Sequence, residues 1–326
     1  MDLNHRLTSP AWAVAVVVAF MTSCGPTPPE PLPEGAFSFG VFGDGPYFLW
    51  EEGRFNRVLK DADAAGAEWL IHVGDILYYP CSDAEYHERL DELNGVSFPV
   101  VYTPGDNEWT DCHEDRTGQY DPLERLESLR QIFFADPARS LGGRKIDLRS
   151  QASDSLYSDF PENARWRHGG VVFATLHVVG SENGMDPFRG REARHDQAVE
   201  RRTSAAIAWM DQAFSDARAD SAWGVVLALH ADIGLSPEDK RDHYDPFVSA
   251  LKEQVAVFPG QVLLIHGDNH ELTIDHPLTD ETGQVYENFT RLETFGSPDI
   301  GWVRVVVDSV NAEIASIEPR KMWGWW

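Results

Sequence analysis

Four short segments of the chain combine glycine with side chains that bind metal ions, at residues 43–45, 74–78, 105–108 and 266–270. Each follows an apolar run typical of a buried strand, and a fifth such run ends in His230-Ala231-Asp232. In layered α/β folds the ends of such strands meet at one edge of a sheet, so these side chains can converge there. Carboxylate, amide and imidazole groups together suit Mn, Fe, Zn or a mixed pair of divalent ions. The candidate ligands are Asp44, Asp75, Asp106 or Asn107, His230, Asp268 and His270.

A purely structural interpretation of each segment is also open. A single Gly-Asp after a strand most often forms a turn in which the aspartate accepts backbone N–H bonds. A histidine that follows an apolar strand, as His230 does, is more often a hydrogen-bonded core residue than a ligand. The occurrence of four such segments in one chain favours metal binding.

The elements that must position these side chains alternate between strands and helices along the chain. Apolar runs predict strands at residues 37–42, 69–73, 99–102, 225–229 and 262–265. Apolar residues at three and four spacing predict helices at residues 54–65, 84–93, 122–134, 198–217 and 246–257. Later segments alternate apolar with polar residues and predict half-exposed strands at residues 288–294, 302–307 and 312–317. The expected fold is α/β, with two packed mixed β-sheets flanked by helices.

Length and charge limit the class of protein. The chain has 326 residues and is 42% hydrophobic, which is enough for one large domain, expected over residues 36–320. Its 27 basic and 53 acidic residues give a net charge of −26, so nucleic acid is an unlikely partner. A phosphorylated small molecule remains a suitable substrate, because metal ions dominate the local charge where they bind.

The N-terminal segment is typical of export. Residues 1–24 combine a short polar start, an apolar stretch and small residues before Cys24, which resembles a bacterial lipobox. This predicts a lipid-modified Cys24 and an exported lipoprotein anchored to a membrane of the bacterial cell envelope, in the periplasm or at the cell surface. A cleaved signal peptide or an uncleaved anchor is the alternative. Residues 25–35 are rich in proline and predict a tether, and residues 321–326 form a Trp-rich tail.

Two further cysteines lie close to the candidate ligands. Cys81 follows Asp75, and Cys112 follows Asp106, in each case by a few residues. In an exported protein such cysteines are expected to pair, which predicts a disulfide between two loops at the metal site. Two unpaired cysteines are the alternative.

The order and spacing of the ligand segments resemble the calcineurin-like metallophosphoesterase superfamily. Its pattern is Asp-x-His, Gly-Asp, Gly-Asn-His-(Asp/Glu), a lone His and Gly-His-x-His, and the similarity covers most of residues 36–310. The Gly74-Asp75-x-x-Tyr78 spacing is similar to that of purple acid phosphatases, in which the tyrosine binds the first metal. The resemblance implies a four-layer sandwich and two divalent or trivalent ions. The first ion would take Asp44, Asp75, Tyr78 and His270, with Asp75 bridging to the second ion.

The second ion site departs from the superfamily pattern. Without gaps, Asp106 stands at the asparagine ligand, Asn107 at the catalytic histidine, and Asp268 at the first histidine of the last motif. The implied ligands are Asp75, Asp106, His230 and Asp268, a set rich in carboxylate that favours Mn, Mg or Ca over Zn. A shift of one residue would make Asn107 the ligand instead of Asp106.

The resemblance implies hydrolysis of phosphate esters or anhydrides by a hydroxide held between two ions. Because Asn107 cannot supply a proton, Glu108, Asp111 and His113 in the same loop are the candidate acids for the leaving group, and His113 has the more suitable unperturbed pKa. A substrate with a good leaving group would need no acid. The alternative function is a non-catalytic, metal-binding envelope lipoprotein that acts as a scaffold or binding module.

Overall fold

The computed structural model describes residues 32–235 and 243–322. The predicted signal peptide, Cys24 and most of the predicted tether lie outside the described residues, as do the four C-terminal residues of the Trp-rich tail. Among the helices of the described residues, none is both long and apolar enough to cross a membrane.

The first sheet has six strands in the order β13-β12-β1-β2-β3-β4. Strands β1, β2 and β3 are parallel, and β12 runs antiparallel to β1. The register places Val41 opposite Ile71, and Ile71 opposite Val101, so the three parallel strands end close together. The strands are β1 (Ala36–Phe42), β2 (Leu70–His72), β3 (Pro99–Tyr102), β4 (Leu141–Gly142), β12 (Gly301–Asp308) and β13 (Glu313–Lys321).

The second sheet has seven strands in the order β10-β11-β9-β8-β7-β6-β5. Strands β7, β8, β9 and β11 are parallel, with antiparallel strands at both edges. The strands are β5 (Arg149–Ser150), β6 (Ala164–His168), β7 (Val171–Thr175), β8 (Gly224–Ala228), β9 (Gln261–His266), β10 (Thr273–Asp275) and β11 (Phe289–Glu293).

The helices begin where the sequence supplies a cap. Ser82 caps α2 by accepting a hydrogen bond from the Glu85 amide, and Asp121 caps α3 through the amides of the next turn. The longest helix, α5, begins at Ala193, five residues before the predicted start, because Glu192 and His195 form a capping box. The helices are α1 (Glu52–Ala64), α2 (Asp83–Asn94), α3 (Pro122–Phe133), α4 (Gly180–Gly184), α5 (Ala193–Ala219) and α6 (Asp245–Val257), with 3-10 turns η1 (Thr110–His113) and η2 (Gln151–Ser153).

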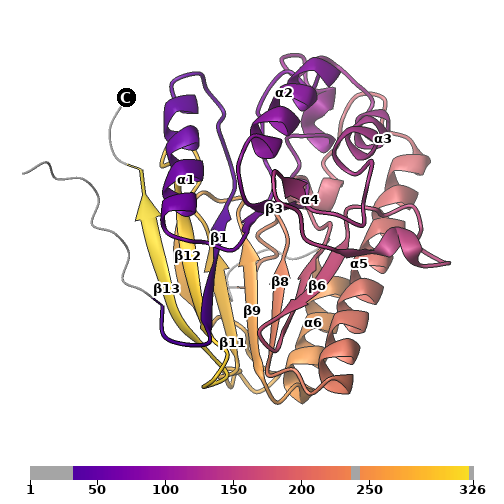
Figure 1. Ribbon diagram of the computed structural model, residues 1–326. Helices are drawn as coiled ribbons and strands as arrows, with labels where there is room; N and C mark the ends of the chain where they lie inside the picture. Colours follow the sequence, from indigo (N-terminus) through magenta and orange to yellow (C-terminus); the bar gives the residue numbers. More distant parts are fainter. Residues whose placement is uncertain (1–31, 236–242, 323–326) are drawn as a thin grey trace, which may run out of the picture. The chain divides into compact units, whose positions relative to one another are not determined.

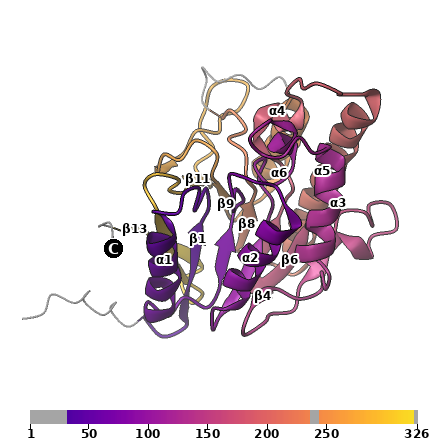
Figure 2. The same ribbon diagram turned by 90° about the horizontal axis from the view of Figure 1, so that it is seen from above.

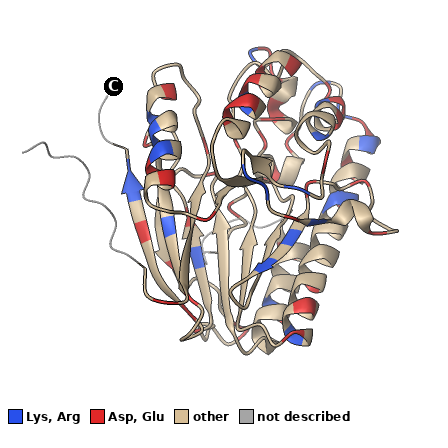
Figure 3. Ribbon diagram, viewed as in Figure 1, with Lys and Arg blue, Asp and Glu red and all other residues tan. Residues whose placement is uncertain are grey.

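Three apolar clusters divide the structure into four layers. Phe42 and Phe55 belong to a cluster between the first sheet and α1 to α3. Phe39 and Phe173 pack between the two sheets, and Trp209 belongs to a cluster between the second sheet and α5 and α6. Figures 1 and 2 show α1 and α2 apart from α5 and α6 with strands between them, and in Figure 3 most of the strand ribbon is uncharged. The predicted α/β fold of two packed mixed sheets flanked by helices is confirmed.

Candidate metal centre

The predicted ligands lie beyond the ends of five parallel strands. Asp44, Asp75 and Asp106 follow β1, β2 and β3 of the first sheet. His230 follows β8, and Asp268 follows β9 of the second sheet. Because the sheets pack face to face, the same edge of both delivers its side chains to one place.

The glycines of the ligand segments leave room for neighbouring ligands. A Cβ atom on Gly105 would stand 2.1 Å from Oδ1 of Asp75, and one on Gly267 would stand 2.1 Å from Oδ2 of Asp44. These glycines are therefore required by the crowding at the site, in addition to any turn that they form.

Four of the candidate ligands have left-handed backbone conformations. The φ angles are 54° at Asp44, 54° at Asp75, 81° at Asp268 and 65° at His270. Residues with side chains rarely adopt this region, and each such residue costs about 1–3 kcal/mol. Backbone strain of this kind concentrates at functional sites, where the surrounding fold holds it in place.

His230 is surrounded by carboxylates. Its Nε2 lies 2.8 Å from Oδ1 of Asp106, 3.4 Å from Oδ1 of Asp75 and 3.9 Å from Oδ1 of Asp268. Its Nδ1 lies 3.0 Å from the carbonyl oxygen of Val73, to which a proton on Nδ1 would be donated. That bond fixes the ring so that Nε2 can present a lone pair to the carboxylates, which is how metal-binding histidines are commonly held.

Several buried atoms of this cluster have no hydrogen-bond partner in the structure. They include Oδ2 of Asp44, Oδ1 of Asp106 and Nε2 of His230. Buried polar atoms are normally paired, so orphaned ligand atoms at one point fit a bound cation. Two overlapping groups have ligand atoms within 4.8 Å of one another, Asp44–Asp75–His230 and Asp106–His230–Asp268. The donor set therefore fits metal ions.

The protonation of the site reflects four carboxylates that share a dry environment. Burial raises the pKa of Asp44 to about 7 and the pKa of Asp268 to about 6, and it raises the pKa of Asp75 well above its usual value. Burial also acts to lower the pKa of His230, but Asp75 and Asp106 outweigh it and raise that pKa well above its usual value. The cluster needs positive charge, which divalent ions would supply.

His270 and Tyr47 complete the side of the cluster around Asp44. The Nδ1 of His270 lies 2.6 Å from the Ser297 carbonyl oxygen, and its Nε2 lies 3.8 Å from Oδ1 of Asp44. Burial lowers the pKa of His270, which favours the neutral ring that binds metals. The Tyr47 hydroxyl donates to Oδ2 of Asp75 at 2.6 Å and lies 3.3 Å from Nε2 of His270.

The tyrosine implied by the resemblance is not the one that reaches the ligands. The Tyr78 ring stacks on Tyr47 at 5.3 Å and lies beneath the Arg116 guanidinium at 4.4 Å. Its hydroxyl makes no hydrogen bond to a ligand side chain within the described residues. Tyr47, three residues after Asp44, was not singled out from the sequence, although the spacing Asp-x-x-Tyr was the signal available.

The structure also distinguishes between the two alignments of the third segment. The Asp106 carboxylate lies against His230, whereas Asn107 contacts the site through its backbone, whose N–H donates to Oδ1 of Asp75 at 3.1 Å. The alignment without gaps, with Asp106 as the candidate ligand, matches this geometry.

Glu108, one of the predicted acids, is engaged by three hydrogen bonds. Its Oε1 accepts from the Ile76 amide at 2.8 Å and from the Tyr102 hydroxyl at 3.0 Å, and its Oε2 accepts from the Gly105 amide at 3.1 Å. Both oxygens are thus engaged, and the side chain is fully buried. Glu108 ties the loop that carries Asp75 to the loop that carries Asp106. Its role as a proton donor to substrate stays a prediction.

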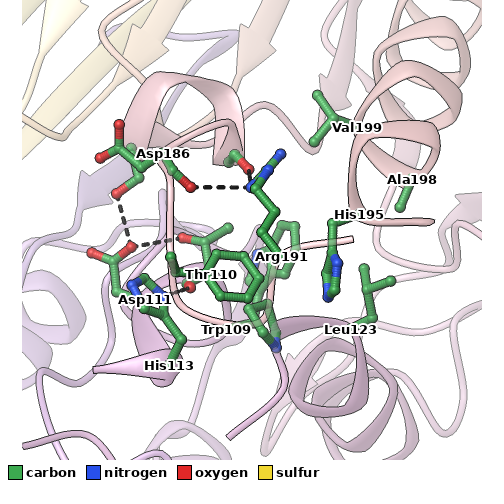
Figure 4. Close-up of a pocket in the computed structure, with 14 residues that line it drawn as sticks. Trp109, Thr110, Asp111, His113, Leu123, Asp186, Arg191, His195, Ala198 and Val199 are labelled. Atoms are coloured by element: carbon green, nitrogen blue, oxygen red, sulfur yellow. Dashed lines mark hydrogen bonds between the residues drawn. The ribbon is translucent and has the colours of Figure 1, made fainter. Parts of the chain in front are cut away.

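His113 lies beside a small cavity (Figure 4). Its Nδ1 lies 2.7 Å from the Thr110 carbonyl oxygen, and its ring stacks on Phe188 at 4.7 Å. The cavity has a volume of about 20 Å³, which is room for about one water molecule. Ser181 lines the cavity and also contacts the candidate ligand Asp106. Its Oγ lies 2.7 Å from Oδ2 of Asp106 and 2.8 Å from Oδ1 of Asp111. Among the described residues His113 has no bond to a ligand.

A disulfide joins Cys81 and Cys112, whose Cα atoms are 5.7 Å apart. It links the loop after Asp75 to η1, which follows Asp106. Two loops that carry ligands are therefore joined covalently, in addition to the hydrogen bonds of Glu108.

No protein-family model matches the chain, and no curated protein matches it in sequence. Solved structures with a similar arrangement include GAP50, the anchor in the inner membrane complex of Plasmodium, at 9% identity and a TM-score of 0.44, covering 89% of this chain and 90% of that one. TT1561 of Thermus thermophilus is 10% identical, with a TM-score of 0.47 and coverage of 88% and 100%. The 5'-nucleotidase from Candida albicans is 10% identical, with a TM-score of 0.40 and coverage of 84% and 51%. Because these TM-scores lie below 0.5, the function proposed below rests on the side chains of the site.

Proposed function

We propose that the protein is a metal-dependent hydrolase of phosphate esters or anhydrides with two ion sites. The observation that carries the proposal is the convergence of five candidate ligands at the ends of five strands; three of these ligands, Asp44, Asp106 and His230, have buried atoms without a hydrogen-bond partner. One ion site comprises Asp44, Asp75 and His270, with Tyr47 beside them. The other comprises Asp106, His230, Asp268 and a second oxygen of Asp75.

Ions bound there would supply Lewis acidity and compensate the negative charge that develops on a phosphoryl group during hydrolysis. The chain's own residues hold the ligands in place. Val73 and Ser297 fix the rings of His230 and His270 through their carbonyl oxygens. Buried Glu51 accepts from the Tyr47 amide at 2.8 Å and from the Ser297 hydroxyl at 2.7 Å, which ties together the two loops around Asp44.

The donor set favours hard ions. Four carboxylates and two imidazoles suit Mn or Mg better than Zn, because oxygen ligands predominate. We therefore propose Mn or Mg as the working ion, with Ca and Fe as the other ions to test.

The hydrogen bonds made by the predicted acids favour substrates whose leaving group needs no proton donor. Glu108 is engaged by three hydrogen bonds, and His113 bonds to the Thr110 carbonyl. Aryl phosphates and phosphoanhydrides have leaving groups of low pKa, so they depart without prior protonation. These are the substrate classes that we propose.

We also propose export and membrane anchoring through Cys24. The support is the lipobox-like sequence and the Cys81–Cys112 disulfide, which is typical of oxidising compartments.

The test is turnover by the full chain after metal removal and reloading with Mn, Mg, Ca, Zn or Fe, on aryl phosphate mono- and diesters. We expect turnover that depends on the ion and is lost in Asp75→Asn. Asp147→Asn is the matched control, because Asp147 is 90% exposed and remote from the ligand segments in sequence. Stoichiometric metal binding without turnover would contradict the hydrolase and favour the non-catalytic lipoprotein.

A further inference from the structure

A continuous row of aromatic side chains leads away from the metal centre. The Tyr47 ring stacks on Tyr78 at 5.3 Å, Tyr78 contacts Phe48 at 6.2 Å, and Phe48 stacks on Trp50 at 4.2 Å with an interplanar angle of 7°. Tyr79, which like Tyr78 lies in the loop after β2, extends the row, and its ring centroid is 5.2 Å from that of Tyr78. We call these five rings the aromatic row.

The outer end of the aromatic row is exposed. Trp50 is 53% exposed and Tyr79 is 46% exposed, and Leu49 between the rings of the first loop is 89% exposed. In the described part of the chain, the other large apolar side chains with comparable exposure are all aliphatic: Leu156, Val257, Ile274, Val285 and Val310. Among residues 32–235 and 243–322, strongly exposed aromatic rings are thus confined to this place. Exposed apolar groups that gather at one place commonly mark a binding site.

The inner end of the aromatic row touches the ligands. The Tyr47 hydroxyl donates to Oδ2 of Asp75, and the Tyr47 ring lies 5.4 Å from the His270 ring. A phosphoryl group held at the metal centre would therefore place its organic substituent next to these rings. Arg116, whose guanidinium covers Tyr78, is 53% exposed and brings a cation to the same edge.

We propose that the aromatic row is the subsite for the organic group of the substrate, and that the substrates are phosphate esters of planar aromatic alcohols. This rests on the proposed hydrolase function. The parallel Phe48–Trp50 pair offers a flat face, and aromatic groups stack on such faces with favourable geometry. In the reaction, the water oxygen forms the new P–O bond. The aryl oxygen leaves as phenolate with the electron pair of the broken bond, and the protons of water remain with phosphate and solvent.

The subsite is consistent with the missing proton donor. An aryl oxygen is a good leaving group, whereas an alkyl oxygen needs a proton. Glu108 and His113 are engaged by backbone groups, and Oδ1 of Asp111 accepts from the hydroxyls of Ser181 and Thr110. The lack of a proton donor for the leaving group and the aromatic row therefore both favour aryl esters.

The first experiment measures binding, so that it does not depend on turnover. The Mn-loaded full chain is titrated with phenylphosphonate and with methylphosphonate, which share the charged group and differ in the ring. We expect phenylphosphonate to bind more tightly, and the ratio of the two dissociation constants to fall by about tenfold in Trp50→Ala/Tyr79→Ala. Leu156→Ala, at a residue that is 62% exposed, is the matched control and keeps the wild-type ratio.

A second readout uses turnover. The ratio of kcat/KM for 4-nitrophenyl phosphate to that for tripolyphosphate, which has no ring, should fall in the double variant and recover largely in Trp50→Phe/Tyr79→Phe. An unchanged phosphonate ratio, or no phosphonate binding to the Mn-loaded chain, would overturn the subsite. A double variant that loses binding to lipid vesicles but keeps its phosphonate ratio would also overturn it and assign the row to a membrane surface. Absence of turnover in wild type would refute the hydrolase alone, because the phosphonate ratio is measured separately.

Discussion

Nε2 of His230 lies 2.8 Å from Oδ1 of Asp106, yet the two atoms form no hydrogen bond and both remain without a partner. The other ring nitrogen of His230 is turned to the Val73 carbonyl. With the proton of Nε2 replaced by a metal ion, both atoms would present lone pairs to that ion. The relationship between these two residues links the two sheets at the proposed second ion site.

Asp106→Asn should therefore lose one ion. An amide oxygen is a weaker ligand than a carboxylate, and the substitution removes one negative charge from the site. We expect metal content at saturating Mn to fall from two ions to one per chain, measured by elemental analysis after gel filtration. Asp147→Asn is the control, and a variant that retains two ions with unchanged affinity would refute this ligand assignment.

The two tyrosines should respond differently to loss of their hydroxyls. Tyr47→Phe removes the hydrogen bond to Asp75, and we expect Mn affinity to fall about tenfold, as for other groups that orient metal ligands. Tyr78→Phe retains the stacked ring and should stay within about twofold of wild type. Calorimetric titration of Mn into both variants measures the two affinities. The reverse order of effects would restore Tyr78 as the ligand.

Glu108→Gln should weaken the fold and the metal site together. The amide cannot accept all the bonds from Ile76, Gly105 and Tyr102, so at least one buried donor loses its partner. We expect a loss of about 1–3 kcal/mol in the free energy of unfolding, measured by urea titration. The exposed Glu313→Gln is the control. Wild-type stability with greatly reduced turnover would instead support a direct role for Glu108 in the reaction.

The buried trio of Glu162, His177 and Arg130 should make the fold sensitive to acid. Although burial opposes it, Arg130 and His177 lower the pKa of Glu162 to about 2, and burial lowers the pKa of His177 to about 4. Both groups bind protons more readily when unfolded. Their stabilisation is thus present near neutral pH and falls as the pH drops, from about 6.5 to about 4 for His177 and from about 4.5 to about 2 for Glu162.

The check is the melting temperature as a function of pH, for wild type and Glu162→Gln. The variant should be less stable at pH 7, because Arg130 loses its charged partner at 2.5 Å. The gap between the two proteins should narrow as the pH falls below about 4.5. A constant gap from pH 7 down to about pH 3 would show that folding does not lower the pKa of Glu162, which would contradict this account.

Reduction of the disulfide should destabilise the ligand loops. The cysteines are 31 residues apart, and closing a loop of that size stabilises the folded state by about 3–4 kcal/mol in the chain-entropy model. Cys81→Ser/Cys112→Ser should therefore lower the free energy of unfolding by about that amount and weaken Mn binding. Unaltered Mn affinity in the double variant would show that Glu108 alone holds the two loops together.

The convergence of the candidate ligands was predictable because a strand followed by Gly-Asp has a strong local pattern. Asp44, Asp75 and Asp106 each follow such a strand, and parallel strands bring their ends together without further information. The five long helices were predictable for the same reason, since their periodicity extends over many residues. Short strands such as β4 and β5, with two residues each, have no such pattern and depend on pairing with a neighbour.

The roles of Tyr47 and Glu108 depend on contacts that the sequence does not contain. Tyr47 reaches Asp75 because of the conformation of its loop, which buried Glu51 holds. Glu108 follows Asp106 and Asn107, so its carboxylate has the sequence position of a catalytic group. Only the fold shows that it faces the backbone of two loops. Side-chain direction in loops is determined by tertiary packing, which local sequence does not specify.

The most direct test of the central claim is titration of Mn into the metal-free chain, with bound metal and hydrolysis of 4-nitrophenyl phosphate recorded in the same samples. The proposal predicts that turnover appears as Mn binds, saturates at two ions per chain, and is abolished in His230→Gln with loss of bound Mn. Turnover that does not depend on added metal, or full Mn binding in His230→Gln, would contradict it.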